Sequence, residues 1–254
     1  MPRRTSALAL AAVLGYALVP APHGDRVVRV YGDLSTAGHV AVLVPGSGTS
    51  AANFDGGPRP YRRPGGAARA LVEQARALDP GGDGLAVVAW LGYDSPAIDS
   101  LGVLTEGAAL EGGAALRRYL GETLGGRRVS LLCHSYGSVV CAKALPGSGV
   151  TDLVVFGSPG LGVSSTAELG AELGAGRGGT RVWAGSGTGD WMRRVPKLRL
   201  GPLGFGPDPA SPSFGARPFA TGAAEHGDYL KPGGTSLRNL ALIALGRPEE
   251  VSGG

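Results

Sequence analysis

The chain has 254 residues, of which 43% are hydrophobic and 17% are charged, and this composition excludes a disordered chain. Its 46 glycines follow no three-residue period, which excludes a collagen-like protein. The formal net charge is +4, but the cations are scattered and no run of Lys or Arg exceeds two residues. We therefore expect no nucleic-acid partner.

The N-terminus has the pattern of a secretory signal. Arg3 and Arg4 precede an apolar stretch, Ser6–Val19, which is too short to span a bilayer comfortably. Ala21 belongs to a small-residue cleavage site. We expect residues 1–22 to direct the protein to the cell envelope or the outside, with no stable membrane insertion after their removal. The alternatives are a helix packed on the domain and an uncleaved membrane anchor.

Residues 26–250 alternate short β-branched runs with longer Ala- and Leu-rich stretches, which predicts one α/β domain: a mostly parallel twisted sheet flanked by helices. In chain order, the predicted elements are strands Arg26–Tyr31 (at an edge) and Val40–Val44, helix Ala67–Leu78, strand Leu85–Leu91, helix Leu104–Leu124, strand Val129–Cys133, helix Tyr136–Leu145, strands Leu153–Phe156, Arg181–Ala184 and Arg217–Ala220, and helix Ser236–Leu245. The Pro- and Gly-rich stretch 190–217 fits neither period. We expect it to form a wall or lid of a binding site, with a solvated excursion over the sheet edge as the alternative.

The two cysteines, Cys133 and Cys141, match no metal-binding spacing, and no metal site is predicted. A strand end and the second turn of the next helix usually place Cα atoms too far apart for a disulfide. Both cysteines are therefore predicted to be small, buried and unpaired.

Residues Cys133–Gly137, which read CHSYG, connect a predicted buried strand to a predicted helix. This is the context of a nucleophile elbow, a tight turn that presents a nucleophilic side chain, here Ser135. The turn requires small residues two positions before and two positions after the nucleophile, and these are Cys133 and Gly137. A serine hydroxyl becomes a good nucleophile only beside a base, and the base needs an acid that orients it.

The base is predicted to be His226. It follows the last predicted strand, as the order of nucleophile, acid and base requires in folds with this elbow. Among the other three histidines, His134 is the neighbour of Ser135, and its side chain is expected to point away from that serine. A structural surface histidine is the alternative for His226.

The acid is predicted to be Asp190, the first carboxylate after the strand Arg181–Ala184. Asp208, further along the same stretch, is the alternative. Asp228 lies only two residues past His226, and we expect it to cap the following turn.

Two backbone N–H groups are needed to bind the oxyanion that forms during acyl transfer. We expect one from Tyr136, which follows the nucleophile at a helix start, and the other from Ser47 or Gly48 in the glycine-rich loop after the strand Val40–Val44. This loop lacks the spacing of a phosphate-binding loop, so neither a nucleotide nor any other cofactor is predicted.

Tyr93 and Asp94 follow the strand Leu85–Leu91 at its carboxyl end, where open α/β sheets bind their ligands. They are predicted to contact the substrate. The alternative is a rigid turn in which Asp94 bonds the local backbone.

These motifs resemble a family of bacterial α/β-hydrolases, a domain of unknown function with an HSYG elbow. The resemblance covers about residues 40–245 and rests on Val44–Thr49 with Asn53–Asp55, Trp90–Pro96, Cys133–Ser138, Asp152–Val154 with Gly157–Gly160, Ser213–Ala216, and His226 with Tyr229–Leu230. Cys133 stands where family members usually have glycine. The resemblance implies the α/β-hydrolase fold and a serine hydrolase without an agreed substrate, in which Ser135 and His226 are catalytic and Asp190 completes the triad.

The leading hypothesis is therefore a serine hydrolase that cleaves an ester or related acyl bond through an acyl-enzyme on Ser135. Its substrate would be a small-molecule or lipid-like acyl compound. Amide, thioester and acyl-transfer chemistry use the same groups and remain open. The alternative is a catalytically silent protein of this fold that binds a ligand or partner.

Overall fold

The computed structural model describes residues 26–82, 84–172 and 179–253. The predicted signal segment, residues 1–22, lies outside the described residues. Within the described part of the chain, no helix is both long enough and apolar enough to cross a bilayer.

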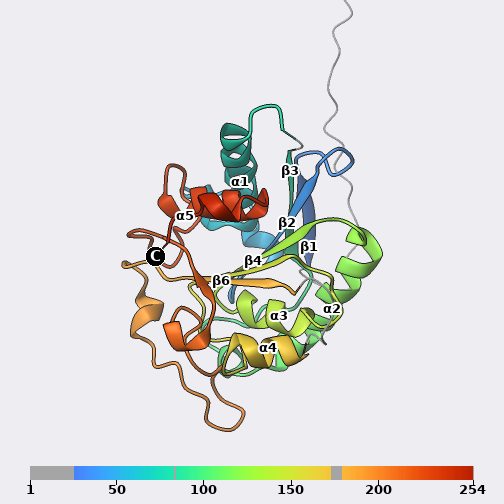
Figure 1. Ribbon diagram of the computed structural model, residues 1–254. Coiled ribbons are helices and arrows are strands. Elements are labelled where there is room, and N and C mark those ends of the chain that lie inside the picture. The colour runs from blue at the N-terminus through green and yellow to red at the C-terminus, as the bar shows by residue number, and fades with distance from the viewer. Residues whose placement is uncertain (1–25, 83, 173–178, 254) are drawn as a thin grey trace, which may run out of the picture.

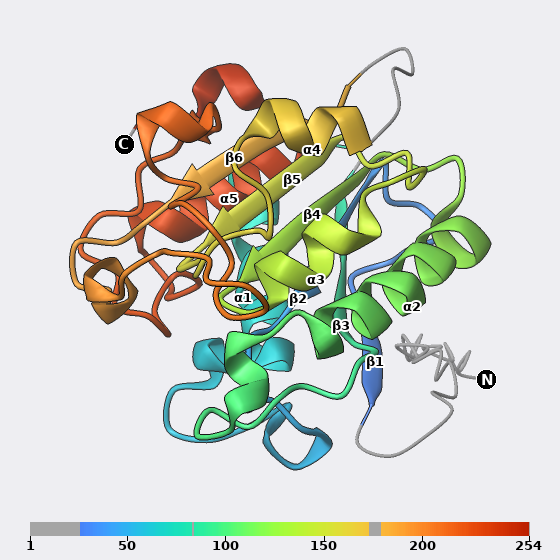
Figure 2. The ribbon, with the colours of Figure 1, turned by 90° about the horizontal axis from the view of Figure 1, so that it is seen from below.

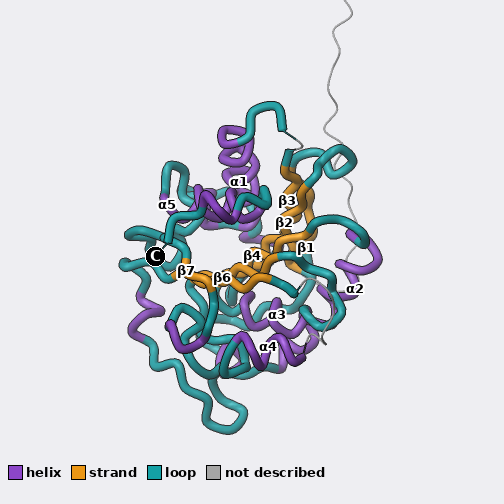
Figure 3. Tube along the Cα trace, in the orientation of Figure 1, coloured by secondary structure: helices purple, strands orange, loops and turns teal. Residues whose placement is uncertain are grey.

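Seven strands form one sheet in the order β1-β3-β2-β4-β5-β6-β7 (Figure 1 and Figure 3). The strands are β1 Val27–Tyr31, β2 His39–Val44, β3 Leu85–Leu91, β4 Val129–His134, β5 Asp152–Phe156, β6 Arg181–Gly185 and β7 Arg217–Pro218. β1 lies at one edge and runs antiparallel to β3, whereas all other pairs are parallel. The predicted mostly parallel α/β sheet is thus confirmed.

The helices cover both faces of the sheet, which explains the continuous apolar runs of its central strands. They are α1 Pro64–Leu78, α2 Gly107–Leu124, α3 Gly137–Ala144, α4 Thr166–Glu172 and α5 Thr235–Ala244. α1 and α5 pack together on one face, and α2, α3 and α4 lie on the other (Figures 1 and 2). Every residue of β3 is buried between these two layers.

Several element boundaries differ from the predicted ones. α1 begins at Pro64 rather than at residue 67, because proline suits the first helical position, where no N–H is needed. The predicted helix 104–124 begins only at Gly107, since Leu101–Leu104 form a separate 3-10 turn. α4 was not predicted. The last strand ends at Pro218: the N–H of Phe219 still donates to Ala184 O of β6, but the N–H of Ala220 donates to Ser252 O near the C-terminus.

The prediction of two unpaired cysteines is wrong, because Cys133 and Cys141 form a disulfide. Cys133 lies in β4 and Cys141 in α3, and both are buried. The elbow turns so sharply that α3 folds back along β4, which brings the two Cα atoms to 6.5 Å. This distance lies within the span of a disulfide. The covalent bond therefore joins the two elements that flank Ser135.

Replacing both cysteines with alanine is expected to lower the free energy of unfolding by about 2–3 kcal/mol, the chain-entropy value for so short a closed loop. Denaturant unfolding of the oxidised protein and of the Cys133→Ala/Cys141→Ala variant measures the difference. Equal midpoints and slopes for the two proteins would contradict a stabilising role for the bond.

Candidate active site

Ser135 lies at the turn between β4 and α3 and is buried. Its φ of 52° makes it the only described residue other than glycine with a positive φ, a conformation that persists only where the surroundings enforce it. The turn is closely packed: a Cβ on Gly137 would lie 2.5 Å from the carbonyl oxygen of Pro45, and a Cβ on Gly46 would lie 2.7 Å from the Cβ of Ser135. The local sequence therefore fixes a strained serine against the loop that follows β2.

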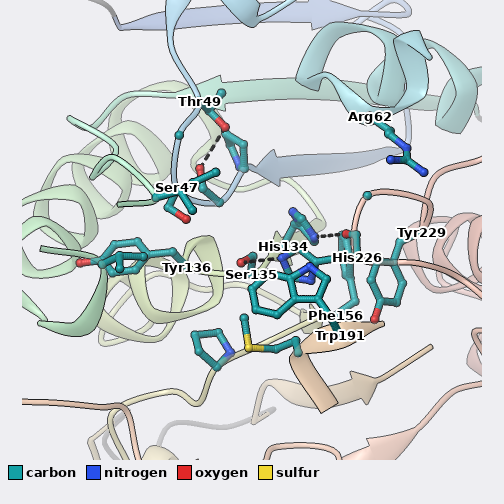
Figure 4. Close-up of a pocket in the computed structure, with 18 of the residues that line it drawn as sticks. Ser47, Thr49, Arg62, His134, Ser135, Tyr136, Phe156, Trp191, His226 and Tyr229 are labelled. Atoms are coloured by element: carbon teal, nitrogen blue, oxygen red, sulfur yellow. Dashed lines mark hydrogen bonds between the residues drawn. The ribbon is translucent and has the colours of Figure 1, made fainter. Parts of the chain in front are cut away.

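His226 lies on the loop between β7 and α5 and reaches Ser135 with one ring nitrogen. Its Nε2 is 3.1 Å from Ser135 Oγ, and a dashed line marks this hydrogen bond in Figure 4. Its Nδ1 is 2.9 Å from one carboxylate oxygen of Asp190 and 3.1 Å from the other. Asp190 follows β6 and begins the 3-10 turn Trp191–Arg194. The structure thus brings the three predicted residues into one hydrogen-bonded row, Asp190, His226 and Ser135.

Asp190 is buried and has several hydrogen-bond donors around its carboxylate. The backbone N–H of Met192 lies 2.8 Å from Oδ1, and the hydroxyl of Tyr229 lies 2.6 Å from Oδ2. Burial raises the pKa of Asp190, but the hydrogen bonds from His226 and Tyr229 outweigh it and hold the pKa below its usual value. The carboxylate is therefore ionised and held in a fixed orientation toward His226.

Tyr229 is a site residue to which the sequence analysis gave no role of its own. Its hydroxyl oxygen accepts the backbone N–H of Gly187 at 3.0 Å, which leaves the hydroxyl hydrogen for Asp190. Burial raises the pKa of Tyr229 far above its usual value, and the adjacent carboxylate adds to the effect. Its position three residues after His226 is the only signal of this role in the sequence.

His134 packs against His226 on the same side of the site. The two ring centroids are 4.7 Å apart, and His134 Nε2 donates to the backbone carbonyl oxygen of His226 at 2.6 Å. Burial, with a smaller contribution from the neighbouring His226, lowers the pKa of His134 to about 3. A neutral His134 therefore supports the loop that carries His226.

The backbone N–H groups of Ser47 and Tyr136 have no protein acceptor among the described residues, and both residues line the cavity beside Ser135 (Figure 4). Gly48 differs, because its N–H donates to the carbonyl oxygen of Pro96 at 2.9 Å. Of the two residues predicted from this loop, Ser47 has the available donor.

Tyr93 and Asp94, the predicted substrate contacts, do not line the cavity. Tyr93 is buried, and its hydroxyl donates to the carbonyl oxygen of Pro45 at 2.9 Å, so that it supports the loop with Ser47. Asp94 is exposed and forms an ion pair with Arg26 at 2.7 Å.

The other two carboxylates considered for the acid lie in other interactions. Asp208 forms an ion pair with Lys197 and accepts the backbone N–H of Ala210. Asp228 pairs with Arg62 Nε at 2.6 Å. The ion pairs and hydrogen bonds found in the described part of the chain connect neither of them to His226.

Ser135 and His226 line a cavity of about 390 Å³, a size typical of small-molecule sites. Most of its lining is apolar and includes Val103, Leu104, Met192, Val195, Leu198 and Phe205. The last four belong to the stretch 190–217, which forms one wall, as predicted. Backbone bonds from Gly204 N to Leu104 O and from Gly162 N to Phe205 O hold that wall in place. Among the described residues, no group of three or more potential ligands is arranged to bind a metal ion.

Comparison with known proteins identifies a family and two relatives of this chain. A family model described as alpha/beta hydrolase matches residues 21–200. An uncharacterized protein of Mycobacterium tuberculosis, Rv2079, is 31% identical over 269 aligned residues, which cover 89% of this chain and 38% of that protein. The chain thus spans little more than a third of the length of this relative. Another uncharacterized protein of that organism, Rv0963c, is 37% identical over 42% of each chain.

Solved structures show the same fold at low sequence identity. An esterase from the fungus Rhizomucor miehei superposes with a TM-score of 0.51 and 11% identity, covering 93% of this chain and 83% of that one. A predicted CIB-like hydrolase from Thermoplasma acidophilum gives a TM-score of 0.51 and 12% identity, covering 92% and 97%.

Proposed function

The chain belongs to the α/β-hydrolase family, and on that premise we propose that it is a serine hydrolase that cleaves an ester or a related acyl bond through an acyl-enzyme on Ser135. The observation that carries the proposal is the hydrogen-bonded row of Asp190, His226 and Ser135 at a strained elbow, facing an apolar cavity. A nucleophile, a base and an orienting acid are what acyl transfer to a serine requires.

The proposed reaction has two steps. Ser135 Oγ attacks the acyl carbon while His226 Nε2 accepts its proton, and Asp190 stabilises the resulting imidazolium. The N–H groups of Ser47 and Tyr136 donate to the oxyanion. Collapse expels the leaving group, which takes the proton from His226. Water then attacks the acyl-enzyme with His226 again as base, which releases the acid and restores Ser135.

The apolar lining of the cavity supports a substrate with a hydrocarbon acyl group, small or lipid-like. Moving such a group from water into an apolar cavity lowers the free energy. An ester is the preferred bond, in keeping with the esterase among the structural neighbours. Amide, thioester and acyl-transfer reactions use the same residues.

We place the mature protein in the cell envelope or outside the cell. The signal pattern in residues 1–22 supports this location. The disulfide between Cys133 and Cys141 supports it independently, because such bonds persist in oxidising compartments.

A fluorophosphonate probe tests the proposed function without knowledge of the substrate, because it reacts with activated serines. We expect it to label the folded protein on Ser135, as read from the modified peptide by mass spectrometry, and to leave Ser135→Ala unlabelled. Labelling should also fall strongly in His226→Ala, which lacks the base. Absence of labelling in folded wild-type protein would refute the hydrolase and favour the catalytically silent binding protein.

A further inference from the structure

Exposed hydrophobic side chains gather at the mouth of the cavity. Of the nine large hydrophobic residues that are exposed among the described residues, three lie in the segment Ile98–Leu104 and five in the segment Trp191–Leu203. We call these two segments the rim. A hydrogen bond of 2.9 Å from the N–H of Gly204, the residue after the second segment, to the carbonyl oxygen of Leu104 in the first brings the two segments together. The second segment includes the orange loop that protrudes at the bottom of Figure 1. Exposed apolar side chains from both segments therefore border the site, and patches of such side chains mark interaction surfaces.

The second segment of the rim is also positively charged, whereas the first contains one carboxylate, Asp99. The segment Trp191–Leu203 contains four cations and no carboxylate. Two of these cations, Lys197 and Arg199, pair with carboxylates of other segments. Arg193 and Arg194 are exposed, and neither forms an ion pair with a described residue. Apolar side chains interspersed with unpaired arginines match the two layers of an anionic lipid surface, its hydrocarbon and its charged headgroups.

We propose that the rim docks on an anionic phospholipid surface, so that the cavity opens directly onto the lipid. Several rim residues, Trp191, Val195 and Leu198 among them, both line the cavity and are exposed outside it. An apolar acyl substrate could thus pass from the lipid to Ser135 without crossing water. A protein seated on the same rim would cover the mouth instead. The delivery of substrate rests on the proposed function, whereas the docking does not.

Vesicle flotation tests the docking with the full chain. Vesicles of ether-linked phosphatidylglycerol and phosphatidylcholine contain no acyl ester to be cleaved, and pure ether-linked phosphatidylcholine provides the uncharged comparison. We expect the protein to float with the anionic vesicles and to bind the neutral ones more weakly. Arg193→Gln and Arg194→Gln should each weaken binding to the anionic vesicles about fivefold at low salt.

A matched set of leucine variants separates the rim from the rest of the surface. Leu101 and Leu200 are 78% and 72% exposed on the rim, and Leu110 is 55% exposed on α2. Leu101→Ser/Leu200→Ser should weaken vesicle binding about tenfold or more, and Leu110→Ser should leave it unchanged. Neither rim leucine lines the cavity, so the double variant should hydrolyse a short soluble ester at the wild-type rate.

Two results would overturn the docking. One is vesicle binding that the rim variants do not weaken. The other is a dimer in sedimentation velocity that Leu101→Ser/Leu200→Ser dissolves, because the rim would then be an interface between copies of the chain. Failure of the proposed function gives a different pattern, since the protein would still float with anionic vesicles but would leave soluble esters intact.

Discussion

Ser135→Ala is expected to lower kcat/KM for an activated ester by about 10³-fold or more, the usual result of removing a triad nucleophile. The hydroxyl of Ser135 is the group that the ring of His226 meets at 3.1 Å. The alanine variant keeps the oxyanion donors and the cavity but has no atom to carry the acyl group. A chromogenic short-chain ester measures the loss, and circular dichroism checks that the variant is folded.

The positive φ of Ser135 calls for a second variant, because alanine is strained in this conformation whereas glycine adopts it readily. Ser135→Gly should therefore fold even if Ser135→Ala does not, and it should be equally inactive. A folded Ser135→Gly protein with most of the wild-type activity would show that Ser135 is not the nucleophile.

Asp190→Asn is expected to cost as much as ~10⁴-fold in rate, the effect of the same substitution in a serine protease. Met192 N–H and the Tyr229 hydroxyl both donate to the carboxylate of Asp190. An amide in its place has a single acceptor oxygen and presents N–H donors to these groups or to His226. The imidazole would then lose its orienting acceptor and adopt the wrong tautomer. Steady-state kinetics with the same ester measure the loss.

Asp208→Asn and Asp228→Asn are the matched controls, because their carboxylates pair with Lys197 and Arg62 respectively. Both should lose little activity, because neither carboxylate lines the cavity or bonds to His226. If Asp208→Asn were folded and more damaging than Asp190→Asn, the acid would have to be reassigned from Asp190 to Asp208.

The strands and the elbow were predictable because their signals are local. A buried parallel strand appears as a short apolar run, and the elbow is fixed by five consecutive residues between a strand and a helix. The positions of His226 and Asp190 in the chain order followed from the same local elements. The hydrogen bond between them depends on how the loop after β6 meets the loop after β7. The sequence indicates the order of these loops but not their contact.

The remaining features depend on contacts between distant segments. The sequence does not distinguish Gly48 from Ser47 as the oxyanion donor. The hydrogen bond that occupies the N–H of Gly48 is accepted by the carbonyl oxygen of Pro96, which lies on a loop distant in the sequence. Tyr93 follows a strand at the end where ligands bind, but its ring is buried beneath the loop that holds Pro45. The disulfide was missed because general distances between a strand and the next helix do not apply across so sharp a turn.

The disulfide at the elbow has a consequence for how the protein matures. This sequence contains only two cysteines, so one pairing is possible within it and it offers neither cysteine a wrong partner. Formation of the bond therefore requires an oxidant but no isomerase. The partners lie only eight residues apart, so forming the bond does not require the C-terminal loop with His226 to be in place. The disulfide and the hydrogen-bonded row of Asp190, His226 and Ser135 can therefore form in separate steps of folding.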